Sequence, residues 1–169
     1  MLNFGKLYVK IFNVMNYELS CSLFGHREIE VTYELKVSLR DIFIDLITSK
    51  KVTIFYFGGF GQFDELCWQV ITELKQNLFP HIKRIYVCEN ETYVNRPSKR
   101  PKWLKNEDYE EIIYFSLTFN YWYTSIYYRN IAIIAHSDYN IFYIRNKHNS
   151  GAYKAYQYAK QNKKNIILI

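Results

Sequence analysis

The sequence predicts an α/β protein with a three-layer, Rossmann-like fold, in which helices flank a mainly parallel sheet. Two patterns predict it: short β-rich runs alternate with stretches of helical periodicity, and glycines follow the expected strands. Right-handed crossovers make a doubly wound sheet the simplest arrangement of such units. The 169 residues, 49% of them hydrophobic, suffice for one domain of ordinary size.

Five strands are expected from short runs rich in β-branched and aromatic residues. They lie at residues 18–23 (ELSCSL), 52–57 (VTIFYF), 82–88 (IKRIYVC), 139–144 (YNIFYI) and 165–169 (NIILI). The run VTIFYF is apolar almost throughout, as a strand covered on both faces requires. It is therefore expected in the interior of the sheet.

Four helices are expected between these strands, because apolar residues recur at spacings of three and four. They run from the capping residue Thr32 through Ile47, over residues 63–74, from about 122 to 136, and over 152–161. Residues 89–119 break the alternation. Within them RPSKRPKW is basic and holds two of the three prolines, which is typical of an exposed loop, and 108–115 is a short element of undecided type.

Composition and cysteine usage limit the classes of protein. Residues 1–17 are expected to be an N-terminal extension to one domain at 18–169, and no run approaches the length of a membrane span. Cys21, Cys67 and Cys88 show neither CxxC nor His/Cys spacing, so neither disulfides nor a metal site is expected. We therefore expect a cytoplasmic protein without metal or cofactor. The formal net charge of +6 favours an anionic partner without choosing between a nucleotide and a polymer.

Three loops at the carboxyl ends of expected strands are candidates for a binding site. They are Phe24-Gly25-His26-Arg27, Gly58-Gly59-Phe60-Gly61 and Asn149-Ser150-Gly151-Ala152. Strand-to-helix turns of this kind let backbone N–H groups converge on a phosphate, and the following helix adds its positive dipole end. The alternative for each loop is a glycine that only permits a tight turn. Because all three are expected at one edge of the sheet, we favour a shared crevice.

Charged side chains near these loops extend the candidate site. The guanidinium of Arg27 is suited to a forked contact with an anion. The hydroxyl of Ser150 is suited to a single hydrogen bond with an anion. Asp64 is a candidate to bind ribose hydroxyls or to orient Arg27, whereas Glu65 fits a favourable position at a helix N-terminus. Arg129, in the aromatic helix IYYRNIAII, points either to the surface or into a polar crevice.

The histidines are weaker candidates. His26 and His136 are expected to be hydrogen-bonding neighbours rather than catalysts, because no Ser or Cys forms a triad pattern with them. The Tyr and Trp cluster between residues 103 and 128 is suited either to stacking on a base or, more commonly, to packing.

Four stretches carry a resemblance to a known family: CSLFGHRE, FYFGGFGQFDEL, YYRNIAIIAHSDYNIFYI and NSGAYKAYQYAKQNKKNIILI. Together they span about residues 18–169 and resemble the SLOG superfamily, most of all its YpsA-like branch of Firmicutes and their phages. The resemblance implies a nucleotide-type ligand at the strand ends. Relatives include the "lonely guy" phosphoribohydrolases, the single-strand DNA-binding DprA proteins, and antiphage sensor domains that bind cyclic ADP-ribose signals.

The resemblance also allows the enzyme branch to be compared with this chain. Those phosphoribohydrolases carry PGGxGTxxE after a strand that follows a helix with a catalytic arginine. Arg129 matches that arginine in context, and Gly151 matches the last glycine of the motif. Ala155 falls where the catalytic glutamate belongs, so the resemblance favours binding without N-glycosidic hydrolysis. Asp64 or Glu65, from the opposite lip of the crevice, is the remaining candidate for that role.

The expected function is therefore binding of a nucleotide or nucleotide-derived signal, by a sensor or, in a phage, by a sequestering protein. Phosphates would bind to backbone N–H groups of the second and third loops, and Asp64, Asn130 or Tyr153 would contact sugar or base. Two alternatives stay open: a phosphoribohydrolase, and single-strand nucleic-acid binding through Lys99, Arg100 and Lys102. A homo-oligomer is expected through residues 121–128.

Overall fold

The computed structural model describes residues 17–99, 105–115, 125–145 and 150–169. In this part of the chain one six-stranded sheet has the order β4-β3-β2-β1-β5-β6, and every neighbouring pair of strands is parallel. The strands are β1 (Leu19–Phe24), β2 (Val52–Phe57), β3 (Lys83–Val87), β4 (Glu111–Ile113), β5 (Tyr139–Phe142) and β6 (Asn165–Leu168).

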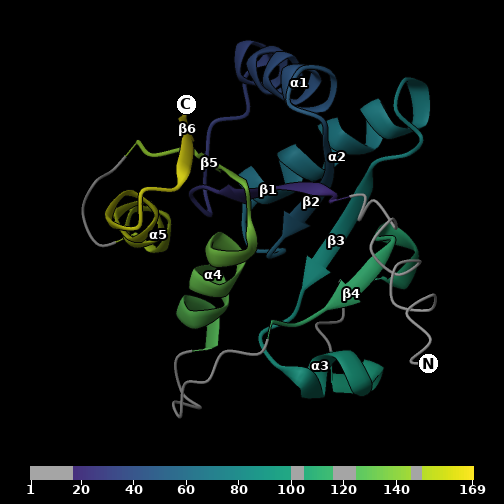
Figure 1. The fold of residues 1–169 in the computed structure, drawn as a ribbon, viewed down its shortest axis with the longest axis vertical. Coiled ribbons are helices and arrows are strands. Elements are labelled where there is room, and N and C mark those ends of the chain that lie inside the picture. The colour runs from purple at the N-terminus through teal and green to yellow at the C-terminus, as the bar shows by residue number, and fades with distance from the viewer. Residues whose placement is uncertain (1–16, 100–104, 116–124, 146–149) are drawn as a thin grey trace, which may run out of the picture.

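Helices cover both faces of the sheet, which makes the fold a three-layer, Rossmann-like sandwich (Figure 1). One face carries α1 (Tyr33–Thr48) and α2 (Gln62–Asn77), and the other carries α4 (Ser125–His136) and α5 (Gly151–Gln161). A short helix, α3 (Glu91–Asn95), and two 3-10 turns, η2 (Pro97–Lys99) and η3 (Asn106–Asp108), lie between β3 and β4.

The hydrophobic core lies on both faces because side chains alternate along each strand. In β2, Phe55 and Phe57 are fully buried on the side of α1 and α2. Tyr56, between them, packs on the opposite face with Phe24 and Phe142. Each buried phenylalanine contributes about 1.5–3 kcal/mol, so the sheet is stabilised from both sides.

The strand order reverses at β1, which pairs with β2 on one side and with β5 on the other. Connections that leave β1 and β5 therefore run to opposite faces and open a crevice at the carboxyl edge. Ser22 and Asn140 are register partners in these strands, and the buried Ser22 hydroxyl donates to Asn140 Oδ1 at 2.7 Å. In this register the two buried polar groups satisfy each other, which favours it over a shifted one.

The structure confirms the α/β fold class and all five expected strands to within two residues at either end. The expected helices are present too, with α4 described from residue 125 onward. The undecided stretch 108–115 contains the extra strand β4, at one edge of the sheet. Residues 1–16 of the expected extension lie outside the described residues. Within the described part, no helix has the length and apolar character needed to cross a membrane.

Candidate functional site

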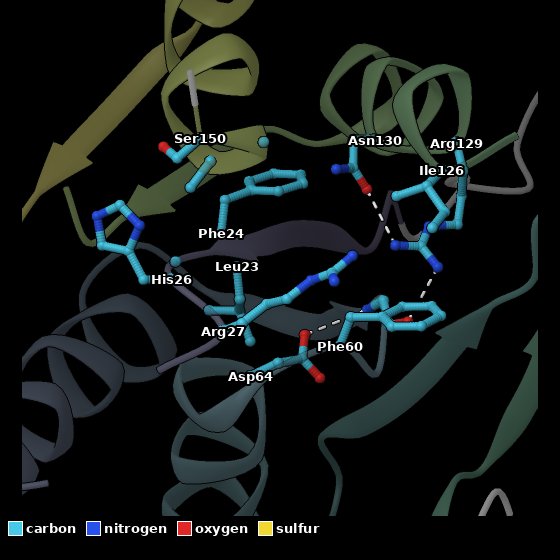
Figure 2. A pocket seen from close by; sticks show the side chains of 14 residues that line it. Leu23, Phe24, His26, Arg27, Phe60, Asp64, Ile126, Arg129, Asn130 and Ser150 are labelled. Carbon is cyan, nitrogen blue, oxygen red and sulfur yellow. Dashed lines mark hydrogen bonds between the residues drawn. The ribbon is translucent and has the colours of Figure 1, made fainter. Parts of the chain in front are cut away.

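A pocket of about 350 Å³ lies at the carboxyl edge of the sheet, where the strand order reverses. Three connections meet there: those that follow β1 and β2, and the one that leads into α5 (Figure 2). The lining residues are Leu23, Phe24, Gly25, His26, Arg27, Gly58, Phe60, Asp64, Ile126, Arg129, Asn130, Ser150, Gly151 and Ala152. All three loops that the sequence marked as candidates thus contribute to one pocket.

The loops after β1 and β2 are locked together through Gly61 and Gln62. The backbone N–H of Gln62 donates to the carbonyl of Arg27 at 2.8 Å, and its side-chain oxygen accepts from the N–H of Ile29 at 2.8 Å. Gly61 has φ of +95°, and a Cβ there would lie 2.5 Å from the Cα of Arg27. Glycine alone meets both demands, so this contact fixes how the two loops meet.

Asp64, in the first turn of α2, holds the position that we expected a phosphate to take at the second loop. Its carboxylate oxygens accept hydrogen bonds from the N–H groups of Gly58 at 3.3 Å and Gly59 at 3.0 Å. Burial raises the pKa of Asp64 to about 6, although the Arg129 guanidinium and the two N–H groups act in the opposite direction. Both amides are therefore already used by the protein's own carboxylate, which corrects their expected role.

Arg129, on α4, places a buried guanidinium in the pocket wall, and the residue is only 5% exposed. It donates to the Gly58 carbonyl at 3.0 Å and to Asn130 Oδ1 at 3.1 Å, and the ring of Phe60 lies 5.2 Å from its central carbon. Its Nε has no hydrogen-bond partner, and no carboxylate of the described residues forms an ion pair with it. Burial lowers the pKa of Arg129. Asp64 and Glu89 stabilise this charge only from a distance, without a direct ion pair. A buried charge that lacks a close partner is costly, so an anion in this pocket is favoured.

The N-terminus of α5 presents unused backbone donors to the same pocket. Ser150 caps the helix: its hydroxyl oxygen accepts from the N–H of Tyr153 at 3.0 Å, and its carbonyl accepts from the N–H of Lys154 at 3.1 Å. The N–H groups of Gly151 and Ala152 have no acceptor among the described residues. A Cβ at Gly151 would meet nothing within 4 Å, so the space beside it is open. Such unpaired N–H groups and the helix dipole attract an anion.

Two side chains of the β1 loop complete the pocket. Arg27 extends across it toward Arg129 and Asn130 (Figure 2) and forms no ion pair within the described residues. His26 accepts, through Nε2, a hydrogen bond from the backbone N–H of Arg145 at 3.0 Å. His26 therefore joins the β1 loop to the segment that follows β5, as the hydrogen-bonding neighbour that the sequence indicated.

Some predicted residues do not line this pocket. Gly59 and Gly61 face an adjoining one, and the ring of Tyr153 lies stacked 6.2 Å from that of Tyr156. Asn130 lines the pocket but also holds the guanidinium of Arg129. Asn149 lies outside the described residues.

Other residues contribute to the pocket without a signal in the sequence. Phe63 packs so closely under Gly25 that a Cβ there would overlap its ring, and Ile126 lines the pocket from α4. Phe63 belonged to an apolar helical stripe, which indicates core packing and nothing more. Gln62, directly after the glycines, carried no signal of its bonds to the neighbouring loop.

Catalytic groups are sparse around the pocket. Ala155, at the position of the relatives' glutamate, is 2% exposed and packs in the core, and Glu65 lines the adjoining pocket. In the described part of the chain no three His, Cys, Asp or Glu side chains gather where they could hold a metal ion. Cys21, Cys67 and Cys88 are buried, and burial raises the pKa of the first two thiols.

Fold and pocket together define a Rossmann-like α/β protein with an electropositive pocket at the carboxyl edge of its sheet. No protein-family model matches the sequence, and a search of curated proteins finds no match. The class therefore follows from the fold and the side chains of the pocket.

Proposed function

We propose that this protein binds a nucleotide or a nucleotide-derived signalling molecule, as a sensor or sequestering protein of the SLOG type. One observation carries the proposal: the guanidinium of Arg129 is almost wholly buried, lines the pocket and forms no direct ion pair with a carboxylate of the described residues. Because ion pairing would offset the cost of burying that charge, the pocket suits an anionic group.

A phosphate would bind on the α5 side of the pocket. Its oxygens would accept from the N–H groups of Gly151 and Ala152 and from the hydroxyl of Ser150, which can donate its hydrogen while its oxygen accepts from the N–H of Tyr153. Arg27 and Arg129 would neutralise the charge from the other side. The volume of about 350 Å³ lies at the lower end of small-molecule sites, as a phosphorylated sugar requires.

Calorimetric titration with inorganic pyrophosphate and with ADP tests the proposal. Arg27→Gln removes an exposed side chain and is expected to leave the fold intact while weakening both probes by about tenfold or more, the effect of one charged hydrogen bond. The matched control, Arg40→Gln on the outer side of α1, should bind as the wild type does. Failure of both probes to bind, or equal affinities in the two variants, would contradict the proposal.

A phosphoribohydrolase is the second candidate, and Asp64 is the observation that favours it. A carboxyl with a pKa of about 6 that lines the pocket has the properties of a general acid or base. Its two bonds to backbone N–H groups favour a structural role instead. Chromatography would measure the release of free adenine from AMP. Release by the wild type that is abolished in Asp64→Asn would establish the enzyme. Intact AMP after long incubation would support binding alone.

Self-association is also proposed, at the start of α4. Ile126 and Tyr127 are 37% and 42% exposed there. A dimer by light scattering that dissociates in Tyr127→Glu would support this surface, whereas a monomeric wild type would exclude it. Nucleic-acid binding gains no support from the structure, since the second half of RPSKRPKW, residues 100–103, lies outside the described residues.

A further inference from the structure

A second pocket, of about 490 Å³, adjoins the first at Arg27 and Asp64, which line both. It lies between the start of α2 and the segment just before β4. Its walls include Gln62, Glu65, Trp68, Asp108 and Tyr109. A ligand that filled both pockets would therefore contact Arg27 and Asp64.

The aromatic wall of the second pocket is held firmly in place. The indole N–H of Trp68 donates to the carbonyl of Asp108 at 3.1 Å, and the guanidinium of Arg84 lies 5.5 Å from the indole centre. The ring of Tyr109 lies 6.5 Å from that of Trp68 and 5.8 Å from that of Phe57 in the core. Burial raises the pKa of Tyr109, so its phenol stays neutral. These contacts present a preformed aromatic surface to the pocket.

The two pockets differ in charge. Arg27 and Arg129 outnumber Asp64 in the first, whereas the carboxylates of Asp64, Glu65 and Asp108 outnumber Arg27 in the second. Carboxylates accept hydrogen bonds from hydroxyl and amino groups and repel phosphate. The second pocket therefore favours the part of a ligand that is rich in donors and carries no negative charge.

We infer that the second pocket receives the nucleoside half of the ligand, with its base against Trp68 and Tyr109 and its sugar hydroxyls toward Glu65 and Asp108. The inference rests on the proposed function, since it assumes that the phosphates bind in the first pocket. It assigns the two halves of one ligand to opposite sides of Arg27. Stacking and donor groups then add affinity that a bare phosphate lacks.

The test compares ADP with inorganic pyrophosphate in a protein whose only tryptophan is Trp68, made by Trp103→Phe and Trp122→Phe. ADP should bind at least about fivefold more tightly than pyrophosphate, the lower bound of stacking on one aromatic side chain. It should also change the fluorescence of Trp68, which pyrophosphate should leave nearly unchanged. Calorimetry on the wild type checks that the two replacements do not alter affinity.

Two glutamates give a matched pair of variants. Glu65→Gln should weaken the binding of ADP several-fold and leave that of pyrophosphate unaffected, because Glu65 lines the second pocket and not the first. Glu107→Gln, an exposed residue that lines neither pocket, should leave both affinities as in the wild type.

The outcomes separate this inference from the proposed function. If ADP and pyrophosphate bind equally and both depend on Arg27, the phosphate site stands and the nucleoside subsite is wrong. ADP could also bind more tightly than pyrophosphate while Glu65→Gln leaves its affinity unchanged and the fluorescence of Trp68 does not respond. That result also overturns the subsite. If neither probe binds, the proposed function fails and the subsite with it.

Discussion

Replacing Asp64 by asparagine removes the carboxylate that bonds to Gly58 and Gly59 in the pocket. The folded protein raises the pKa of Asp64 from 3.8 to about 6, mainly through burial. The folded state therefore holds the proton more tightly than the unfolded chain. The stabilisation from this proton is fully present below pH 3.8 and is lost as the pH rises through about 6. A pKa shift of about 2 units, at about 1.4 kcal/mol for each unit, corresponds to about 3 kcal/mol of the unfolding free energy.

This effect is measured by guanidinium denaturation of the wild type and of Asp64→Asn. The measurements run from pH 3.5 to pH 8, about the range set by these two pKa values. We expect the unfolding free energy of the wild type, relative to the variant, to fall by about 3 kcal/mol across the range and to level off above pH 7. Asp41→Asn, at an exposed position on α1, is the control and should show no such fall. If this difference in unfolding free energy stays constant with pH, or grows as the pH rises, the raised pKa of Asp64 is refuted. Arg129 and the two N–H groups would then lower that pKa at least as much as burial raises it.

Four further variants, at three positions, test the packing around the site. Gly61→Ala should destabilise the fold by about 1–3 kcal/mol or more in thermal melts, because it adds a strained φ to a clash with the backbone of Arg27; an unchanged melting temperature would contradict this. Ser150→Ala removes the cap of α5 and should cost about 1 kcal/mol, and Ser150→Asp, which restores an acceptor, should recover that stability while repelling pyrophosphate. Glu110→Gln breaks the pair with Arg84, whose Nη2 donates at 2.9 Å, and should cost about 1–2 kcal/mol in urea denaturation; a neutral result would show that solvent screens the pair.

The layers of the fold followed from local patterns. The unbroken run of β2 predicted an interior strand, and β2 lies between β1 and β3 with Phe55 and Phe57 buried. The rule that ligands bind beyond the carboxyl ends of parallel strands placed the three loops at one edge. Their shared pocket confirms that geometry, which depends only on strand direction and chain order.

What the sequence did not reveal depends on contacts between distant segments. Whether the amides of Gly58 and Gly59 meet a ligand or Asp64 is decided by the distance from α2 to the turn, which no periodicity encodes. The aromatic wall at Trp68 arises because Asp108, 40 residues later, returns to the side of α2. The stretch from 89 to 119 lacked a regular pattern, so its path was not predictable.

The reversal of strand order at β1 has a consequence for how the protein matures during synthesis. Arg129 bonds to the Gly58 carbonyl across 71 residues, and Arg145 bonds to His26 across 119. Contacts of such high sequence separation form slowly, because a long loop must first close. A nascent chain that ends before α4 can pair β1, β2 and β3 but has only one lip of the pocket. Affinity for pyrophosphate is therefore expected to appear only once α4 and α5 have been made and folded.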